Sequence, residues 1–150
     1  MKHEDIVKKI INHIKKNRMD ALESMETFHK NKVGIEHWFK VEIVRALQDT
    51  ENYVISIKNK GPDLELINGE LIELKGATDF NPKYYIEGLE QHITENEDCK
   101  TCIALGFDPN NSLSDLKDSI IEKAKEFTFN FNFQIFDIDR NWYIVLLERV

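Results

Sequence analysis

Residues 61–76 read GPDLELINGELIELKG. Leucine and isoleucine alternate with charged residues on both sides of Asn68-Gly69, which is the pattern of a β-hairpin with one buried face. A two-residue loop would mix charge with leucine on both faces. A three-residue loop over 67–69 separates them, with Gly69 at a positive φ in a G1 bulge, and we predict this register. The face predicted to point to the core then consists of Leu64, Leu66, Ile72 and Leu74.

The opposite face of this hairpin is predicted to be polar. Its members are Asp63, Glu65, Leu71, Glu73 and Lys75. Asp63 lies directly opposite Glu73, and like charges in that position destabilise a sheet. A divalent cation between the two carboxylates removes the conflict, and Mg²⁺ keeps further positions for water and phosphate. The hairpin therefore predicts a magnesium site for phosphodiester hydrolysis, in which Lys75 helps to activate the attacking water and offsets developing charge.

The rest of the chain is predicted to alternate between helices and strands. Helices are expected at about 5–18, 35–47, 83–96 and from Ser112 or Ser114 to about 127. Strands are expected at about 53–57, 63–67, 70–75, 101–107, 132–137 and 142–147. No linker, repeat or low-complexity stretch interrupts this order. We predict a single α/β domain over residues 1–150.

Two of the expected helices carry charges that need an interpretation. Helix 5–18 has isoleucines on one face and lysines on the others. Those lysines either solvate a surface helix or lie along a phosphate backbone, and we favour the first interpretation. Helix 35–47 is apolar on more than half of its circumference. Glu36 and Glu42 stand out on it, because a carboxylate on a buried helix needs a partner or a metal.

The spacing of the charged residues in the hairpin resembles a known signature. Pro62-Asp63, nine intervening residues and then Glu73-Leu74-Lys75 is similar to the motif of the PD-(D/E)XK, or restriction-endonuclease-like, nucleases. That family has a helix, a three-strand meander with the motif, a helix and a strand. The resemblance implies such a core over about 34–127, with a mixed central sheet flanked by helices. The helix before it and the C-terminal strands would be additions.

The resemblance also implies roles for individual residues. Asp63 and Glu73 would be metal ligands, and the carbonyl of Leu74 would be a further ligand. Lys75 would be the catalytic lysine. A glutamate on the preceding helix commonly completes the metal site of such nucleases. Glu36 matches it by position, and Glu42 is the alternative. The expected cofactor is Mg²⁺, with Mn²⁺ as a substitute.

Two further features near the motif have weaker interpretations. Some relatives carry a glutamine and a tyrosine on the helix after the meander. Gln91 sits on such a helix, but Glu95 stands where the tyrosine would be. Lys58 and Lys60 precede the motif, where they either contact phosphate or are ordinary charges near a turn.

The composition restricts where the protein acts. The 150 residues are 41% hydrophobic and 31% charged, with a net charge of −7. No apolar run approaches the roughly 18 residues of a membrane helix, and the first residues do not resemble a secretory signal. Two cysteines fit a reducing compartment, so we expect a cytoplasmic protein without a membrane partner. The negative charge is compatible with DNA binding if the carboxylates hold cations.

Together these observations predict a Mg²⁺-dependent DNA endonuclease. DNA is the expected partner, and a homodimer is expected because cutting both strands needs two sites. The chain is short for a base-reading domain, so a protein partner is expected to supply tight specificity. The alternative is a non-catalytic member of the same fold that binds nucleic acid or scaffolds a complex.

Overall fold

The computed structural model describes residues 2–51, 53–57, 62–95 and 98–150. Its first elements are α1 (His3–Asn17), α2 (Met19–Met25), the 3₁₀ helix η1 (Glu26–Asn31), α3 (Glu36–Leu47), β1 (Val54–Ile57), β2 (Leu64–Leu66) and β3 (Leu71–Gly76). They are followed by α4 (Pro82–Thr94), β4 (Thr101–Phe107), α5 (Leu113–Ala124), β5 (Phe131–Asp139) and β6 (Trp142–Arg149).

The described strands form one six-stranded sheet in the order β1-β2-β3-β4-β6-β5. β1, β2 and β3 are an antiparallel meander, β3 and β4 are parallel, and β6 pairs antiparallel with both β4 and β5. The parallel pair requires a crossover, and α4 provides it. The α/β class and the mixed central sheet are confirmed.

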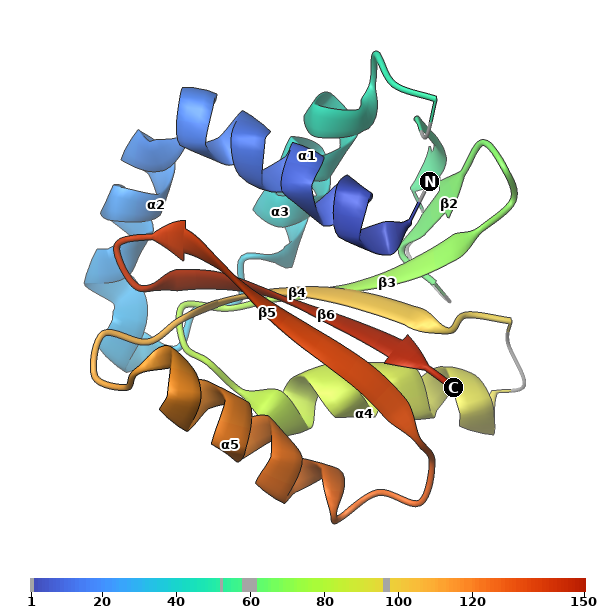
Figure 1. The fold of residues 1–150 in the computed structure, drawn as a ribbon. Coiled ribbons are helices and arrows are strands. Elements are labelled where there is room, and N and C mark those ends of the chain that lie inside the picture. The colour runs from blue at the N-terminus through green and yellow to red at the C-terminus, as the bar shows by residue number, and fades with distance from the viewer. Residues whose placement is uncertain (1, 52, 58–61, 96–97) are drawn as a thin grey trace.

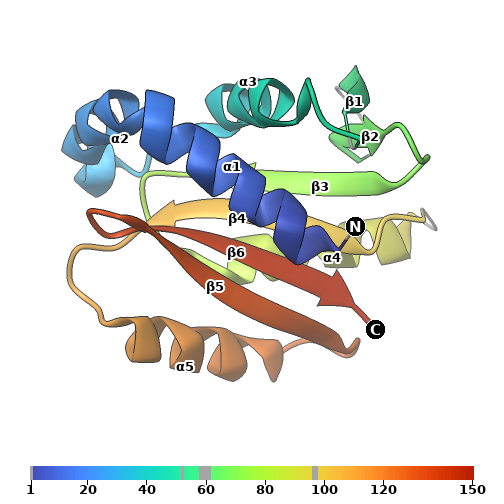
Figure 2. The same cartoon turned by 45° about the horizontal axis from the view of Figure 1, so that its top comes forward.

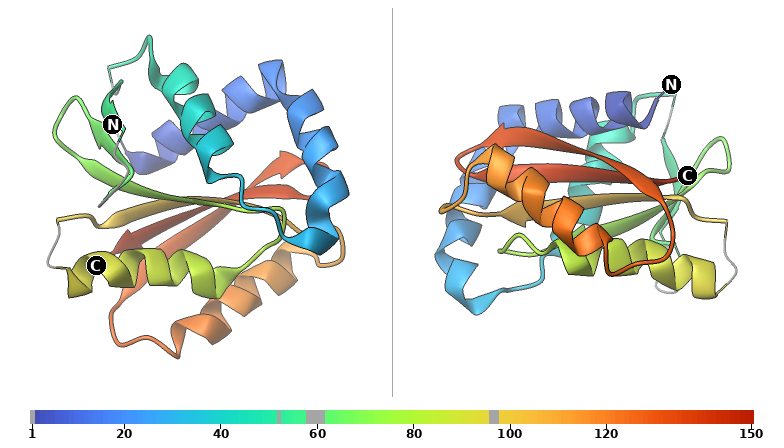
Figure 3. Two further views of the ribbon diagram at one scale, coloured as in Figure 1. Left: turned by 180° about the vertical axis from the view of Figure 1, so that it is seen from behind. Right: turned by 60° about the horizontal axis from the view of Figure 1, so that its bottom comes forward.

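Helices cover both faces of the sheet (Figures 1 and 2). α1, α2 and α3 lie over one face, where residues such as Phe39 and Trp142 form the larger core cluster. α4 and α5 lie over the other face, where Tyr85 and Leu89 belong to a second cluster (Figure 3). β4 is buried along its whole length, because its neighbours lie on both sides and helices lie on both faces.

Local sequence signals account for where the main helices begin. Asn81 caps α4 by accepting a hydrogen bond from the backbone N–H of Tyr84, and Pro82 follows in the first turn. Ser112, rather than Ser114, caps α5 in a capping box with Asp115. The sequence did not predict α2 and η1, which bury only Leu22 between them and so lack a long apolar stripe.

The first helix packs as a surface helix. α1 buries Ile6, Val7, Ile10 and Ile14. Lys8 remains 57% exposed and pairs with Glu4 one turn earlier. The structure thus agrees with the favoured interpretation of its isoleucine face. Among the described helices, none combines the length and the apolar character needed to cross a membrane. Cys99 and Cys102 are both buried thiols.

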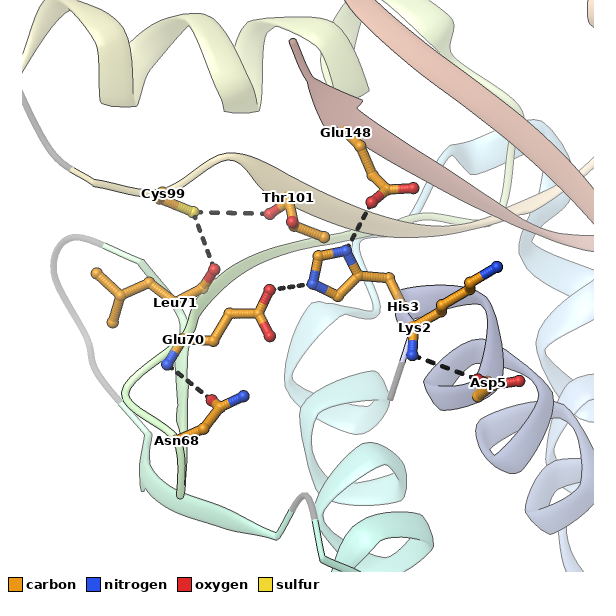
Figure 4. A network of polar contacts seen from close by, with 9 residues as sticks. All are labelled: Lys2, His3, Asp5, Asn68, Glu70, Leu71, Cys99, Thr101 and Glu148. Atoms are coloured by element: carbon orange, nitrogen blue, oxygen red, sulfur yellow. Dashed lines mark hydrogen bonds and ion pairs between the residues drawn. The ribbon is translucent and has the colours of Figure 1, made fainter.

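His3 joins the start of α1 to the sheet (Figure 4). Its Nδ1 lies 2.7 Å from a carboxylate oxygen of Glu148 at the end of β6, and its Nε2 contacts Glu70 beside the hairpin loop. Burial alone would lower the pKa of His3, but the hydrogen bonds to Glu148 and Glu70 outweigh it and raise the pKa above 6.5. A neutral imidazole has one N–H, so only the protonated ring donates to both carboxylates.

This contact predicts a pH-dependent contribution to stability. Because the pKa of His3 is raised on folding, its contribution is complete below about pH 6.5 and is lost as the pH rises through the folded-state pKa. Replacing the imidazole in His3→Gln should therefore cost more unfolding free energy at about pH 6 than at about pH 9. Urea unfolding at both pH values measures the difference. An equal cost at both would contradict the protonated bridge.

Candidate active site

The hairpin adopts the register expected from its sequence. Leu64 pairs with Ile72 and Glu65 pairs with Leu71, so Asp63, just before β2, lies across from Glu73. The backbone N–H of residue 66 donates to the carbonyl of residue 70 at 2.9 Å, and Gly69 has a φ of 87°. The four apolar side chains on the other face belong to the core: Leu64, Leu66, Ile72 and Leu74. The predicted three-residue loop is confirmed.

Asp63 is held by two different donors. One carboxylate oxygen accepts the backbone N–H of Leu74 at 2.8 Å. The other lies 2.6 Å from the Nζ of Lys40, which comes from α3. Asp63 and Lys40 are each only 8% exposed. A buried ion pair this short keeps both charges compensated away from water.

Glu73 is the most perturbed carboxyl group of the cluster. One of its oxygens lies 2.5 Å from Nε2 of His92, and the other lies 3.4 Å from Nζ of Lys75. Burial and then the nearby charge of Asp63 raise the pKa of Glu73 from 4.5 to about 7, against the opposing effects of His92 and Lys75. Glu73 is thus harder to ionise than an exposed carboxyl group.

Tyr84 connects the carboxylate of Glu36 to the pair formed by Asp63 and Glu73. Its hydroxyl donates a hydrogen bond to Glu36 in the first turn of α3. The Nζ of Lys75 lies 4.6 Å from the centre of the same ring, within the range of a cation–π contact. Burial and then Glu36 raise the pKa of Tyr84, so the phenol stays neutral at physiological pH. Glu36 therefore reaches the cluster through Tyr84.

α4 presents a stripe of three residues to the hairpin. Tyr84, Gly88 and His92 follow one another at intervals of four, so they lie on one helix face. A Cβ atom on Gly88 would lie 2.9 Å from Cε of Lys75 and 3.4 Å from Cγ of Glu73. The glycine therefore lets α4 approach the polar face of the hairpin closely, which brings His92 within reach of Glu73.

Gly88→Ala is expected to separate stability from activity. Alanine in the helix interior stabilises α4 by roughly 0.5–1 kcal/mol. The new methyl group displaces the flexible end of Lys75 rather than the backbone, so a cleavage activity that depends on this lysine should fall roughly 10- to 100-fold. Thermal unfolding and cleavage rates measure the two effects. The exposed Glu90→Ala on the same helix is the control, and unchanged cleavage in Gly88→Ala would argue against the predicted position of Lys75.

The structure brings together most, but not all, of the residues predicted for the site. Asp63 lies across from Glu73, and Lys75 contacts Glu73. Glu36 joins them through the hydroxyl of Tyr84 on α4. Glu42, the alternative to Glu36, lies elsewhere: it is buried among His13, Arg18 and Arg45 at 3.1, 3.3 and 3.6 Å. It compensates the basic groups between α1 and α3, so the alternative was wrong.

The weaker expectations have different outcomes. Gln91 is exposed and donates a hydrogen bond to Glu95, which follows the end of its helix, whereas its neighbour His92 contacts Glu73. Lys58 and Lys60 lie outside the described residues. Nothing in the structure bears on the carbonyl of Leu74 as a ligand, which stays a prediction.

Sequence reasoning missed four residues of the cluster, which are Lys40, Tyr84, Gly88 and His92. Lys40 sits four residues after Glu36, so the two share a face of α3, and it is the only charged residue within the run Trp38–Val41. The regular spacing of Tyr84, Gly88 and His92 was visible as well. These spacings indicated which residues share one face of α3 and one face of α4. Only the packing of the two helices against the hairpin shows what those faces contact.

Comparison with known proteins adds no further constraint. No protein-family model, no curated protein and no solved structure matches this chain.

The carboxylates suit a divalent cation in chemistry and position. Asp63 and Glu73 are oxygen donors held opposite one another, and burial together with the charge of Asp63 raises the pKa of Glu73. Within the described ranges, no group of three or more His, Cys, Asp or Glu side chains is arranged as a ready metal site. Lys40 and Lys75 supply positive charge to this pair in the structure. As oxygen donors, the two carboxylates fit a hard cation such as Mg²⁺ that uses few protein ligands.

Proposed function

We propose that this protein is a Mg²⁺-dependent deoxyribonuclease of the PD-(D/E)XK type. The observation that carries the proposal is the pair of buried carboxylates, Asp63 and Glu73, placed opposite each other with Lys75 on the same face. Burial and the charge of Asp63 raise the pKa of Glu73, and perturbed carboxyl groups of this kind cluster at functional sites. The order of elements from α3 to α5 also agrees with the family core.

The side chains have distinct proposed roles. Asp63 and Glu73 would hold the cation, with the carbonyl of Leu74 as a further ligand and Glu36 in reach through Tyr84. When bound, Mg²⁺ supplies Lewis-acid activation of the scissile phosphate and of the attacking water. Lys75 lies beside Glu73 and over the ring of Tyr84, where its charge would offset the negative charge that develops on the phosphate.

One observation favours the non-catalytic alternative. Lys40 already compensates Asp63 at 2.6 Å, so the cluster is nearly balanced without a metal. In that case the fold would bind nucleic acid or scaffold a complex, and the buried pair would only orient α3. The two functions differ in whether DNA is cut.

A cleavage assay tests the proposal. The protein is incubated with supercoiled plasmid, single-stranded DNA and branched DNA, in Mg²⁺, in Mn²⁺ and in chelator. Asp63→Asn, purified in the same way, controls for contaminating nucleases. Metal-dependent cleavage by the wild type alone supports the proposal. Equal cleavage by both proteins, or none in either metal, contradicts it and favours the non-catalytic alternative.

The products of the same assay address the proposed assembly. A homodimer with two sites should convert plasmid to the linear form in one binding event, whereas a single site leaves nicked circles. A protein partner that supplies specificity would concentrate the cuts at defined positions. The proposed cellular location is the cytoplasm.

A further inference from the structure

Lys40 is placed where a lysine is costly. α3 turns Phe39, Ile43 and Leu47 into the core, and Lys40 is buried on the same helix. Its ammonium group ends 2.6 Å from an oxygen of Asp63. Taking an ammonium group out of water is strongly unfavourable unless a partner compensates it. Asp63 provides that compensation.

The position of this ammonium group has a consequence for metal binding. The other oxygen of Asp63 accepts the backbone N–H of Leu74, so both oxygens are engaged. A divalent cation bound to the oxygen that Lys40 contacts would lie next to its ammonium group. Two positive charges within a few ångströms in a buried site repel each other strongly. Lys40 and the metal therefore compete for one oxygen.

We propose that Lys40 is a built-in competitor, which compensates Asp63 in the metal-free protein and must leave that oxygen when a divalent cation binds. This inference rests on the proposed metal site. It explains how two buried carboxylates are tolerated during folding, before any metal is present. It also implies that Lys40 lowers the affinity of the site for the metal and sets the concentration at which the site fills. Lys40 is thus a positioning residue, because it acts on the metal through Asp63.

Direct measurement of Mn²⁺ binding tests this role without an activity readout. The signal of free Mn²⁺ in electron paramagnetic resonance gives the Kd for the wild type, Lys40→Gln and Lys40→Met. Lys40→Gln keeps a hydrogen-bond donor for Asp63, so it can replace Lys40→Met if the methionine variant does not fold. Circular dichroism checks that both variants are folded. Lys8→Gln removes the same unit charge from an exposed ion pair on α1 and is the matched control.

The expected result is a Kd about ten-fold lower or more in the neutral Lys40 variants, because a charge next to the bound cation is gone. The Kd of Lys8→Gln should stay within about two-fold of the wild type, since exposed charges are screened. Adding Asp63→Asn to Lys40→Gln should abolish the gain. An unchanged or higher Kd in both neutral Lys40 variants overturns the proposal.

The same measurements separate this inference from the proposed function. If the wild type binds Mn²⁺ and cuts DNA while the neutral variants bind no more tightly, only the role of Lys40 fails. If the neutral variants bind more tightly but no protein cuts DNA, the role of Lys40 stands and the nuclease function fails. If neither the wild type nor any Lys40 variant binds Mn²⁺, both fail.

Discussion

Replacing Lys75 by alanine is expected to slow DNA cleavage by about 10²- to 10⁴-fold. Lys75 lies 3.4 Å from Glu73 and over the ring of Tyr84, where its charge is positioned beside the proposed metal pair. Removing it deletes a group that stabilises the transition state and deletes no metal ligand. The affinity for Mn²⁺ should therefore persist, or increase slightly, because a competing positive charge has gone. Single-turnover cleavage and Mn²⁺ binding measure the two effects.

The control for this variant is Lys83→Ala. Lys83 lies on α4, but it is 56% exposed and pairs only loosely with Glu87 at 3.9 Å. Its loss changes the net charge equally and should alter cleavage by less than about three-fold, because exposed charges are screened. If Lys75→Ala cuts DNA as fast as Lys83→Ala, the hairpin is a cation-binding face without a catalytic lysine.

Mg²⁺ is expected to stabilise the wild-type protein substantially. A metal that binds only the folded state at about 100 times its Kd adds about 2.7 kcal/mol to the free energy of unfolding. For a domain of this size that corresponds to an increase of about 5–10 °C in Tm. The increase should shrink in Asp63→Asn and Glu73→Gln, which remove the charges the cation needs. Calorimetry with and without Mg²⁺ measures it, and equal increases in all three proteins would contradict the metal site.

Glu73→Gln should also change the metal-free protein. The pKa of Glu73 rises from 4.5 to about 7 on folding, so the folded state binds more protons than the unfolded state between these values. The free energy of unfolding therefore falls as the pH rises through this window. Glu73→Gln cannot ionise and should be free of that loss. In chelator, the unfolding free energies of the wild type and the variant should thus differ more at about pH 8 than at about pH 4.

The hairpin shows how far sequence reasoning reaches in this protein. Its period-two pattern and the glycine at position 69 specify the loop, the register and the face of each side chain. They therefore also predict that Asp63 and Glu73 oppose each other. Burial on one face makes a slip of one residue too costly. The helices with long apolar stripes and clear caps were equally predictable, whereas α2 and η1 were not, because they bury little.

The partners of the carboxylates could not be predicted in the same way. Glu36 and Glu42 occupy the same helix and are both acidic, so the sequence left them as alternatives. Their side chains leave α3 in different directions, one toward Tyr84 and the other toward His13 on α1. That difference depends on how α1 and α4 pack against α3, which no local pattern encodes. His92 was hidden for the same reason, since its contact with Glu73 spans two elements.

Every side chain of the cluster comes from residues 36–92. The last third of the chain therefore has a structural role outside the cluster. β4, β5, β6 and α5 supply the rest of the sheet and one of its covers. The exposed turn from Asp108 to Ser112 joins two of these elements and is stabilised by its own side chain–backbone bonds. Exposed turns of this kind tolerate inserted segments. A recognition module could therefore be added there over evolution, or by engineering, without rebuilding the chemistry.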